Sequence, residues 1–403
     1  MALDVAALRA QFPSLASGIA HFDGPGGTQT PAVVGEAVAR TLTGPLSNRG
    51  TLVASEQNAD DAVAAFRQAM ADFLNADPRG VVYGRSATQL AYDFSRHLAK
   101  QWQPGGNIVV SRLDHDSNVR PWVQAAQANG QEVRWIAIDP ATGELDMASA
   151  QTAIDDRTRV VAFTGASNIL GTIPDISAVA ALAHAHGALA YLDAVHYAAH
   201  ELVDLPALGV DFVVCSPYKF LGPHCAVLAA SPALLETITP DKLLPSTNVV
   251  PERFEFGTLP YELMAGVTAA VDFLAAIDPG TATTRRDRLA VSYASVHEHE
   301  TRLRERIEAG LASLGSAVVL HSNAKRRTPT LFITMPGRRT ADASRFLAAL
   351  NVLAPSSNFY GYEPFMALGV DDDGGLRMGV APYTDDSDVD RLLEGLTDYL
   401  ARG

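Results

Sequence analysis

Short apolar runs alternate with segments of helical periodicity through the first 230 residues of the chain. Runs such as 107–111, 160–164 and 211–215 are apolar at almost every position. Such runs are typical of strands that are buried on both faces of a parallel sheet. Polar or glycine-rich residues follow each run, and a segment with helical spacing comes next. This repetition predicts an α/β fold with a mostly parallel central sheet covered by helices.

The alternation stops beyond this region. The later pattern predicts a long charged helix over 285–314, a few strands, and a final amphipathic helix. This mixture is typical of a second, smaller α+β domain. We therefore predict a large domain over 21–265, and a small domain formed by 1–20 together with 266–403.

Polar side chains follow the ends of five predicted strands. Because the carboxyl ends of parallel strands meet at one edge of a sheet, where α/β proteins bind ligands, we expect these side chains to lie close together. The sequence therefore predicts a site at this edge that contains Thr88, His115, Asn168, Asp193 and Lys219.

Lys219 is the most unusual of these residues, since it follows the buried run 212–215 on a short connection. A lysine held in apolar surroundings has a lowered pKa and can form a Schiff base. From these residues alone, an ordinary surface lysine is the alternative. Similarly, the residues 84–88 between a strand and a helix can present backbone N–H groups to a phosphate, or simply cap the helix.

The composition limits the partners that we expect. A net charge of −14 and a pI near 5.2 argue against nucleic acid or an anionic membrane as a partner. We find neither the apolar core of a signal peptide nor an apolar stretch long enough to cross a bilayer. Two cysteines form no disulfide framework, so we expect a cytoplasmic protein. The acidic and histidine residues of 297–300 point to different helix faces, so we predict no metal site.

Taken together, the motifs resemble the class V aminotransferases, and within them the cysteine desulfurase group of pyridoxal 5'-phosphate (PLP) enzymes. The resemblance implies the fold-type I PLP transferase fold, with a large PLP-binding domain. It extends from Phe22 to about Leu396 and rests on Ser86-Ala87-Thr88, Asp114-His115, Ser167-Asn168-Ile169-Leu170-Gly171-Thr172, Asp193-Ala194-Val195-His196, Ser216-Pro217-Tyr218-Lys219-Phe220-Leu221-Gly222-Pro223, Phe254-Glu255-Phe256-Gly257-Thr258 and Arg377.

The resemblance implies a role for each motif. Lys219 would carry PLP as a Schiff base and move the Cα proton, while Asp193 would pair with the pyridine nitrogen and His115 would stack over the ring. Arg377 would bind the substrate carboxylate. The remaining cofactor contacts would come from Ala87, Thr88 and Ser216 at the phosphate, from Asn168, His196 and Tyr218 around the ring or substrate, and from Thr258 of the partner subunit in a homodimer.

The sequence departs from the desulfurase pattern at several positions. Tyr218 replaces the usual histidine before the lysine, and His196 replaces the usual glutamine. Desulfurases carry a nucleophilic cysteine on a loop before the arginine, whereas Tyr360 stands about there in this chain and Pro355 takes the place of an arginine. We therefore predict that this protein forms no persulfide at that loop.

We expect a PLP-dependent transferase or lyase that acts on a small α-amino acid by lyase or transaminase chemistry. The alternatives are an epimerase of the isopenicillin N epimerase type and a non-catalytic PLP-fold scaffold. A desulfurase that uses Cys215 or Cys225 is a further alternative, although both are better interpreted as buried core thiols. The aromatic residues Phe359, Tyr360 and Tyr362 indicate a bulkier or apolar substrate group, or else only fill the loop.

Overall fold

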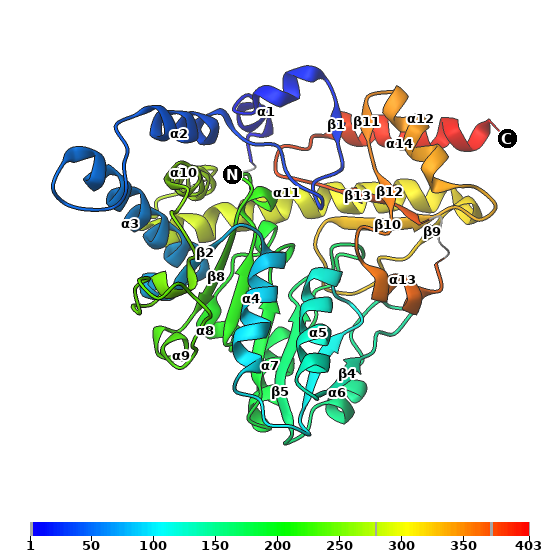
Figure 1. Cartoon of the computed structure of the whole chain (residues 1–403). Coiled ribbons are helices and arrows are strands. Elements are labelled where there is room, and N and C mark those ends of the chain that lie inside the picture. The colour runs from blue at the N-terminus through cyan, green and yellow to red at the C-terminus, as the bar shows by residue number, and fades with distance from the viewer. Residues whose placement is uncertain (1–2, 279, 371–373, 403) are drawn as a thin grey trace.

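A seven-stranded sheet forms the centre of the molecule (Figure 1). The structure is a computed structural model that describes residues 3–278, 280–370 and 374–402. The strand order is β2-β8-β7-β6-β5-β3-β4, in which β8 alone runs antiparallel to its two neighbours. The strands are β2 (Val81–Gly84), β3 (Asn107–Ser111), β4 (Glu132–Ile136), β5 (Thr158–Thr164), β6 (Leu189–Asp193), β7 (Phe212–Cys215) and β8 (Ala226–Ala230).

Helices cover both faces of this sheet. Within β3, Ile108 and Val110 face the side that α4 and α5 cover, whereas Val109 faces the side of α3, α7 and α10. The predicted burial on both faces is therefore confirmed for inner strands such as β3, whereas the edge strand β4 is only partly buried. The helices around the large sheet are α2 (Ala32–Thr43), α3 (Ala54–Leu74), α4 (Ala87–Ala99), α5 (Arg120–Ala128), α6 (Met147–Ala153), α7 (Ile176–Ala185), α8 (Leu205–Leu208), α9 (Pro232–Glu236) and α10 (Tyr261–Ala276).

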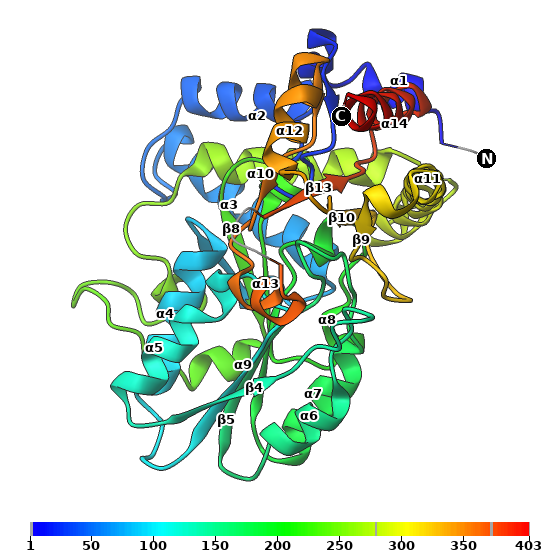
Figure 2. The ribbon, with the colours of Figure 1, turned by 90° about the vertical axis from the view of Figure 1, so that its right-hand side faces the viewer.

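A smaller antiparallel sheet, with the order β12-β13-β10-β9, lies beside the long helix α11. The chain start joins this part, because β1 pairs with β11 in parallel. Both views place α12 and α14 beyond α11, away from the large sheet (Figures 1 and 2). The elements are α1 (Val5–Arg9), β1 (Ala20–His21), α11 (Arg285–Ser313), β9 (Val319–Leu320), β10 (Thr330–Thr334), α12 (Thr340–Ala349), β11 (Val352–Leu353), β12 (Ser356–Ser357), α13 (Tyr362–Leu368), β13 (Gly375–Gly379) and α14 (Asp386–Ala401).

The α/β fold with a mostly parallel sheet is as predicted. The predicted final helix is also present, and Asp385 and Asp388 form a capping box at its start. The sequence pattern missed β13 and α13, because each is short and lies beside irregular segments. The domain boundaries stay a prediction.

None of the helices in the described ranges is long and apolar enough to cross a membrane.

Candidate active site

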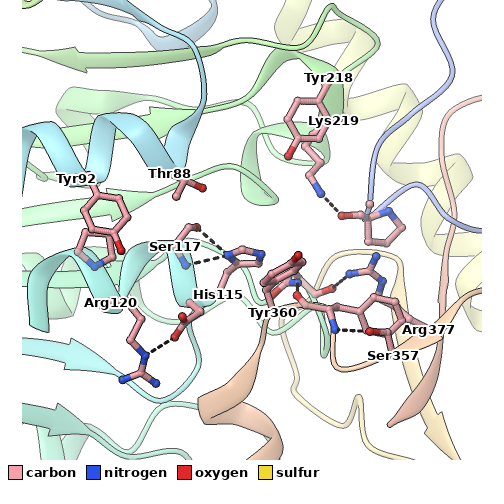
Figure 3. A pocket seen from close by; sticks show the side chains of 16 residues that line it. Thr88, Tyr92, His115, Ser117, Arg120, Tyr218, Lys219, Ser357, Tyr360 and Arg377 are labelled. Carbon is pink, nitrogen blue, oxygen red and sulfur yellow. Dashed lines mark hydrogen bonds and ion pairs between the residues drawn. The ribbon is translucent and has the colours of Figure 1, made fainter. Parts of the chain in front are cut away.

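Two adjoining cavities lie at the carboxyl edge of the parallel strands. The inner one has a volume of about 80 Å³ and the outer one about 650 Å³. All five residues predicted to meet at this edge line at least one of the two cavities. Six residues line both cavities, namely Thr88, His115, Ser117, Asn168, Tyr218 and Lys219 (Figure 3). The five side chains therefore lie close together at this edge of the sheet, and their roles stay a prediction.

Lys219 lies at the end of a short 3₁₀ turn after β7, and its amine points into the site. The side chain is buried, and its Nζ donates a hydrogen bond to the carbonyl of Pro25. Burial lowers the pKa of Lys219 to about 7, with a further contribution from Arg377, while Asp193 opposes the shift. A substantial fraction of the amine is therefore neutral and nucleophilic near neutral pH.

Asp193 is the last residue of β6 and lines the inner cavity. Its Oδ1 accepts the backbone N–H of Val195 at 2.9 Å. Burial raises the pKa of Asp193 to about 6, although the hydrogen bond and Lys219 both favour the charged form. A cation placed beside this carboxylate would keep it ionised.

His115 lies just beyond β3 and lines both cavities. Its Nδ1 accepts the backbone N–H of Ser117 at 3.1 Å and lies 2.8 Å from Ser117 Oγ. Burial, with smaller contributions from Lys219 and Arg377, lowers the pKa of His115 to about 4. The ring is therefore neutral, and because Nδ1 accepts a hydrogen bond, the proton is on Nε2.

A buried carboxyl group holds the His115 loop in place. Asp114 accepts hydrogen bonds from the Ser111 hydroxyl, from Asn118 Nδ2 at 2.7 Å and from the Thr164 backbone N–H at 3.1 Å. These donors come from β3, from the turn after His115 and from β5. Asp114 belongs to one of the motifs of the sequence, but its role could not be predicted, because its partners become neighbours only in the folded chain.

Several buried polar atoms at the site have no hydrogen-bond partner among the described residues, and two of them belong to His196 and Asn168. His196 Nε2 lies 3.0 Å from Thr328 Oγ1 and 2.9 Å from Thr330 Oγ1, which leaves its Nδ1 unpaired. Asn168 Nδ2 donates to the carbonyl of Phe359 at 3.0 Å, and its Oδ1 is unpaired. Because buried polar atoms normally find hydrogen-bond partners, both atoms are available to a ligand in the cavity.

The start of α4 borders the inner cavity. Ser86 caps this helix, since its Oγ accepts the Gln89 backbone N–H at 3.1 Å. The N–H groups of Ala87 and Thr88 in the first turn have no acceptor within a helix, and such groups bind phosphate well. Ser216 and Tyr218 lie across the same cavity. Thr258 is exposed and lines neither cavity of this chain.

Arg377 reaches the outer cavity from β13 of the smaller sheet. Its Nη1 donates to the carbonyl of Asn168 at 2.9 Å, and the Phe359 ring lies 3.8 Å from its Cζ. Its Nε is buried without a partner in the part of the chain that the structure describes. Burial lowers the pKa of Arg377 to about 9, so the guanidinium stays charged and can receive a carboxylate.

Sequence reasoning missed several residues that line the site. The carbonyl of Pro25 belongs to a glycine-dense loop, and this glycine content was the one signal that the backbone approaches the site closely. Ser117 and Arg120 gave no signal, because their contacts join segments far apart in the sequence.

The residues at 297–300, for which we predicted no metal site, contact different partners. His297 Nδ1 lies 3.4 Å from Glu201, whereas His299 Nε2 lies 2.8 Å from the carbonyl of Thr384. Glu300 is paired with His200 at 2.8 Å. The side chains therefore turn to different partners.

The groups of the inner cavity fit PLP. Lys219 supplies an amine of lowered pKa for an aldehyde, Asp193 a buried carboxylate for a pyridinium nitrogen, and α4 a helix start for a phosphate. The unpaired atoms of His196 and Asn168 are suited to further polar contacts with such a ring. The fold and the site together define a PLP-dependent enzyme of fold-type I.

Comparisons with known proteins agree with this class. Residues 20–392 match the model of the aminotransferase class-V family, and the chain belongs to that family. An uncharacterized protein of Mycobacterium tuberculosis (strain CDC 1551 / Oshkosh) is 32% identical over 98% of this chain and 99% of the relative. A probable cysteine desulfurase of Pseudomonas aeruginosa is 28% identical over 96% of each chain.

The fold has counterparts among solved structures. The cysteine desulfurase CsdA of Escherichia coli superposes with a TM-score of 0.87 at 24% identity and covers all of both chains. Cysteine desulfurase from Thermococcus onnurineus superposes with a TM-score of 0.89 at 23% identity, covering 100% of this chain and 99% of that one. The predicted family, fold and cofactor are thus confirmed.

Proposed function

We propose that this enzyme acts on a small α-amino acid through Lys219, by lyase or transaminase chemistry, and that it forms no persulfide. The observation that carries the proposal is the position of its thiols. Cys215 and Cys225 are both buried, and burial raises the pKa of each thiol, that of Cys225 to about 12. A buried neutral thiol is a poor nucleophile. The exposed loop position resembling that of the desulfurase cysteine carries Tyr360.

Each residue of the site would have a distinct role in the reaction. Bound PLP supplies an electron sink for negative charge at the substrate Cα. Arg377 would hold the substrate carboxylate, which its unpaired Nε and its charge support. Lys219 would take up or return the Cα proton at Nζ, since a base is most effective when its pKa lies near the working pH. His115 would stack over the cofactor ring, while Asp193 would keep the pyridine nitrogen protonated.

The remaining cofactor contacts follow from the same geometry. Ala87 and Thr88 would bind the phosphate through the start of α4, together with Ser216. Asn168, His196 and Tyr218 would hydrogen-bond the ring or the substrate, and this use is supported by the unpaired atoms of the first two.

We further propose a homodimer in which Thr258 reaches the partner's phosphate site. Large apolar side chains on two neighbouring loops support an interface there, since Leu52 is 88% exposed and Leu244 is 100% exposed. The two segments that carry these leucines are joined by an ion pair, in which Arg49 Nη1 lies 3.3 Å from Glu252 Oε1. The acidic charge and two unpaired thiols are consistent with the reducing cytoplasm that we propose as its location.

The test is an absorbance spectrum of the purified holoenzyme, which is then titrated with L- and D-amino acids. We expect an absorbance band of lysine-bound PLP that shifts with an amino acid, together with product formation. Incubation with L-cysteine should give no protein persulfide, whereas a known cysteine desulfurase assayed in parallel should give one.

Other outcomes would replace the proposal. A persulfide on Cys215 or Cys225 would identify a desulfurase that uses an internal thiol. Loss of optical activity without a new product would identify an epimerase, and a protein that never binds PLP would be a scaffold.

A further inference from the structure

The loop between β12 and α13 is tied directly to the active site. The carbonyl of Tyr360 accepts the Asp116 backbone N–H at 2.8 Å, and that of Phe359 accepts Asn168 Nδ2 at 3.0 Å. Phe359 and Tyr360 both have a left-handed backbone, with φ of 51° and 56°, respectively. Non-glycine residues adopt such conformations where surrounding contacts hold them. A Cβ at Gly361 would collide with Ile169, so the loop lies tightly against the strand-end segment.

A buried carboxylate fastens the helix that follows this loop. Glu363 is 5% exposed and receives Arg112 Nη1 at 2.6 Å and Arg120 Nη2 at 2.6 Å. Both views show α13 apart from α12 and α14, on the side toward α5 (Figures 1 and 2). Hydrogen bonds between ionised groups in partly buried places are the strong ones. Through these two hydrogen bonds, Glu363 holds the loop against the part of the chain that contains Arg112 and Arg120.

The same contacts neutralise the outer end of the cavity. Arg120 lines this end, but its Nε lies 2.7 Å from Asp116 and its Nη2 binds Glu363. Two guanidinium groups thus face two carboxylates, and no net charge is left for a charged substrate group. A charged side chain entering here would lose hydration without gaining a free partner.

Ring surfaces make up much of the remaining wall. Tyr92, Tyr218, Phe359 and Tyr360 line the outer cavity, and the Tyr360 ring lies 5.6 Å from that of His115. The volume of about 650 Å³ is in the range that encloses ligands much larger than the smallest amino acids. Aromatic walls bind apolar and planar groups by burial and ring contacts.

We propose that, among free α-amino acids as small molecules, the site selects those with a bulky, uncharged and preferably aromatic side chain. Phe359 and Tyr360 are the contacts that determine this specificity, and Glu363 is a positioning residue that acts through their loop. This inference rests on the proposed function, because it assumes that the α-carboxylate binds Arg377 at the inner end of the same cavity.

Calorimetry on the holoenzyme tests the selectivity without requiring the reaction. The probes are phenylpropionate, propionate and succinate, which carry a carboxylate but no amino group. We expect phenylpropionate to bind at least about tenfold more tightly than propionate, since a filled apolar pocket discriminates to this degree. Succinate should bind no better than propionate. Equal affinity for phenylpropionate and propionate, or a preference for succinate, would overturn the inference.

Variants of the loop locate the effect. Tyr360→Ala should reduce the phenylpropionate preference severalfold, whereas Tyr360→Phe should keep it, because the ring and not the hydroxyl makes the contact. Glu363→Gln should raise the KM for an aromatic substrate more than it lowers kcat. Met366→Ala is the matched control, since this side chain is 61% exposed on the same helix and does not line the cavity. An unchanged preference in Tyr360→Ala would contradict the assignment.

A parallel titration with L-phenylalanine separates this inference from the proposed function. If phenylpropionate keeps its preference but no amino acid shifts the cofactor absorbance, the specificity holds and the proposed activity fails. If L-alanine shifts the absorbance at the same concentration as L-phenylalanine, the activity is supported and the specificity is refuted.

Discussion

The inner and outer walls of the active site are built in different ways. The inner wall consists of strand ends and a helix start of the large sheet, where Asp193, Lys219 and α4 are held by neighbouring strands. The outer wall joins α5 and the turn after β3 to α13 and the loop before it, and the hydrogen bond between Arg120 and Glu363 links residues 243 positions apart. The inner wall therefore rests on regular pairing within one sheet, whereas the outer wall depends on contacts between distant segments.

The largest expected effect concerns the inner wall. Lys219→Ala removes the amine that we assign to PLP attachment and proton transfer, so activity should fall by about 10²- to 10⁴-fold or more. Turnover assays together with mass spectrometry after borohydride reduction would measure the loss of activity and of the covalent link. Lys100→Ala, on the surface beside Asp241, should leave both unchanged. Full turnover by Lys219→Ala would refute the proposed function.

A second change tests whether the inner frame is rigid because of Asp114. Asp114→Ala leaves the Ser111 hydroxyl, the Asn118 amide and the Thr164 N–H without their buried acceptor. The free energy of unfolding should fall by about 3 kcal/mol, as expected for several unsatisfied buried groups. Urea denaturation would measure it. The exposed Asp156→Ala should change stability by less than about 0.5 kcal/mol, and an equal loss there would contradict this interpretation.

The pH dependence of the Lys219 amine tests whether Arg377, which reaches the cavity from the smaller sheet, lowers the pKa of this lysine. In the protein without cofactor, the amine is protonated below its pKa of about 7 and neutral above it. Covalent capture of PLP should therefore increase as the pH rises through about 7 and then level off. Arg377 lowers this pKa, so Arg377→Gln should move the midpoint to higher pH. Stopped-flow absorbance would follow the capture, and a midpoint near 10 in the native protein would contradict the buried position of the amine.

The smallest expected effect concerns the two buried thiols. It tests whether they only fill space in the core or take part in the reaction. Cys215→Ala and Cys225→Ala each remove a buried sulfur from the sheet region and should cost about 1 kcal/mol of stability. Activity on an amino acid should be unchanged, since we assign neither thiol a chemical role. Loss of turnover in a variant that remains folded would favour the desulfurase alternative.

The sequence by itself determined the central frame of this protein. Continuous apolar strands at regular intervals indicated a parallel sheet. The polar residues that follow these strands, and that line the cavities, are Thr88, His115, Asn168, Asp193 and Lys219. The prediction of the strands was possible because strand periodicity is a local property of the sequence. Once the strands are known to be parallel, their carboxyl ends must lie at one edge of the sheet. The resemblance to a known family added Arg377, although the pattern did not predict the strand β13 that carries it.

Only the tertiary structure decided the outer wall. The hydrogen bond from Lys219 to Pro25, the stacking of Phe359 on Arg377 and the pairing of Glu363 with Arg112 and Arg120 join distant segments. No periodicity records such pairs, because they depend on how the smaller sheet packs against the larger one. The same packing sets the burial that lowers the pKa of Lys219, so the direction of this shift could be expected from the sequence, whereas its size depends on the folded site.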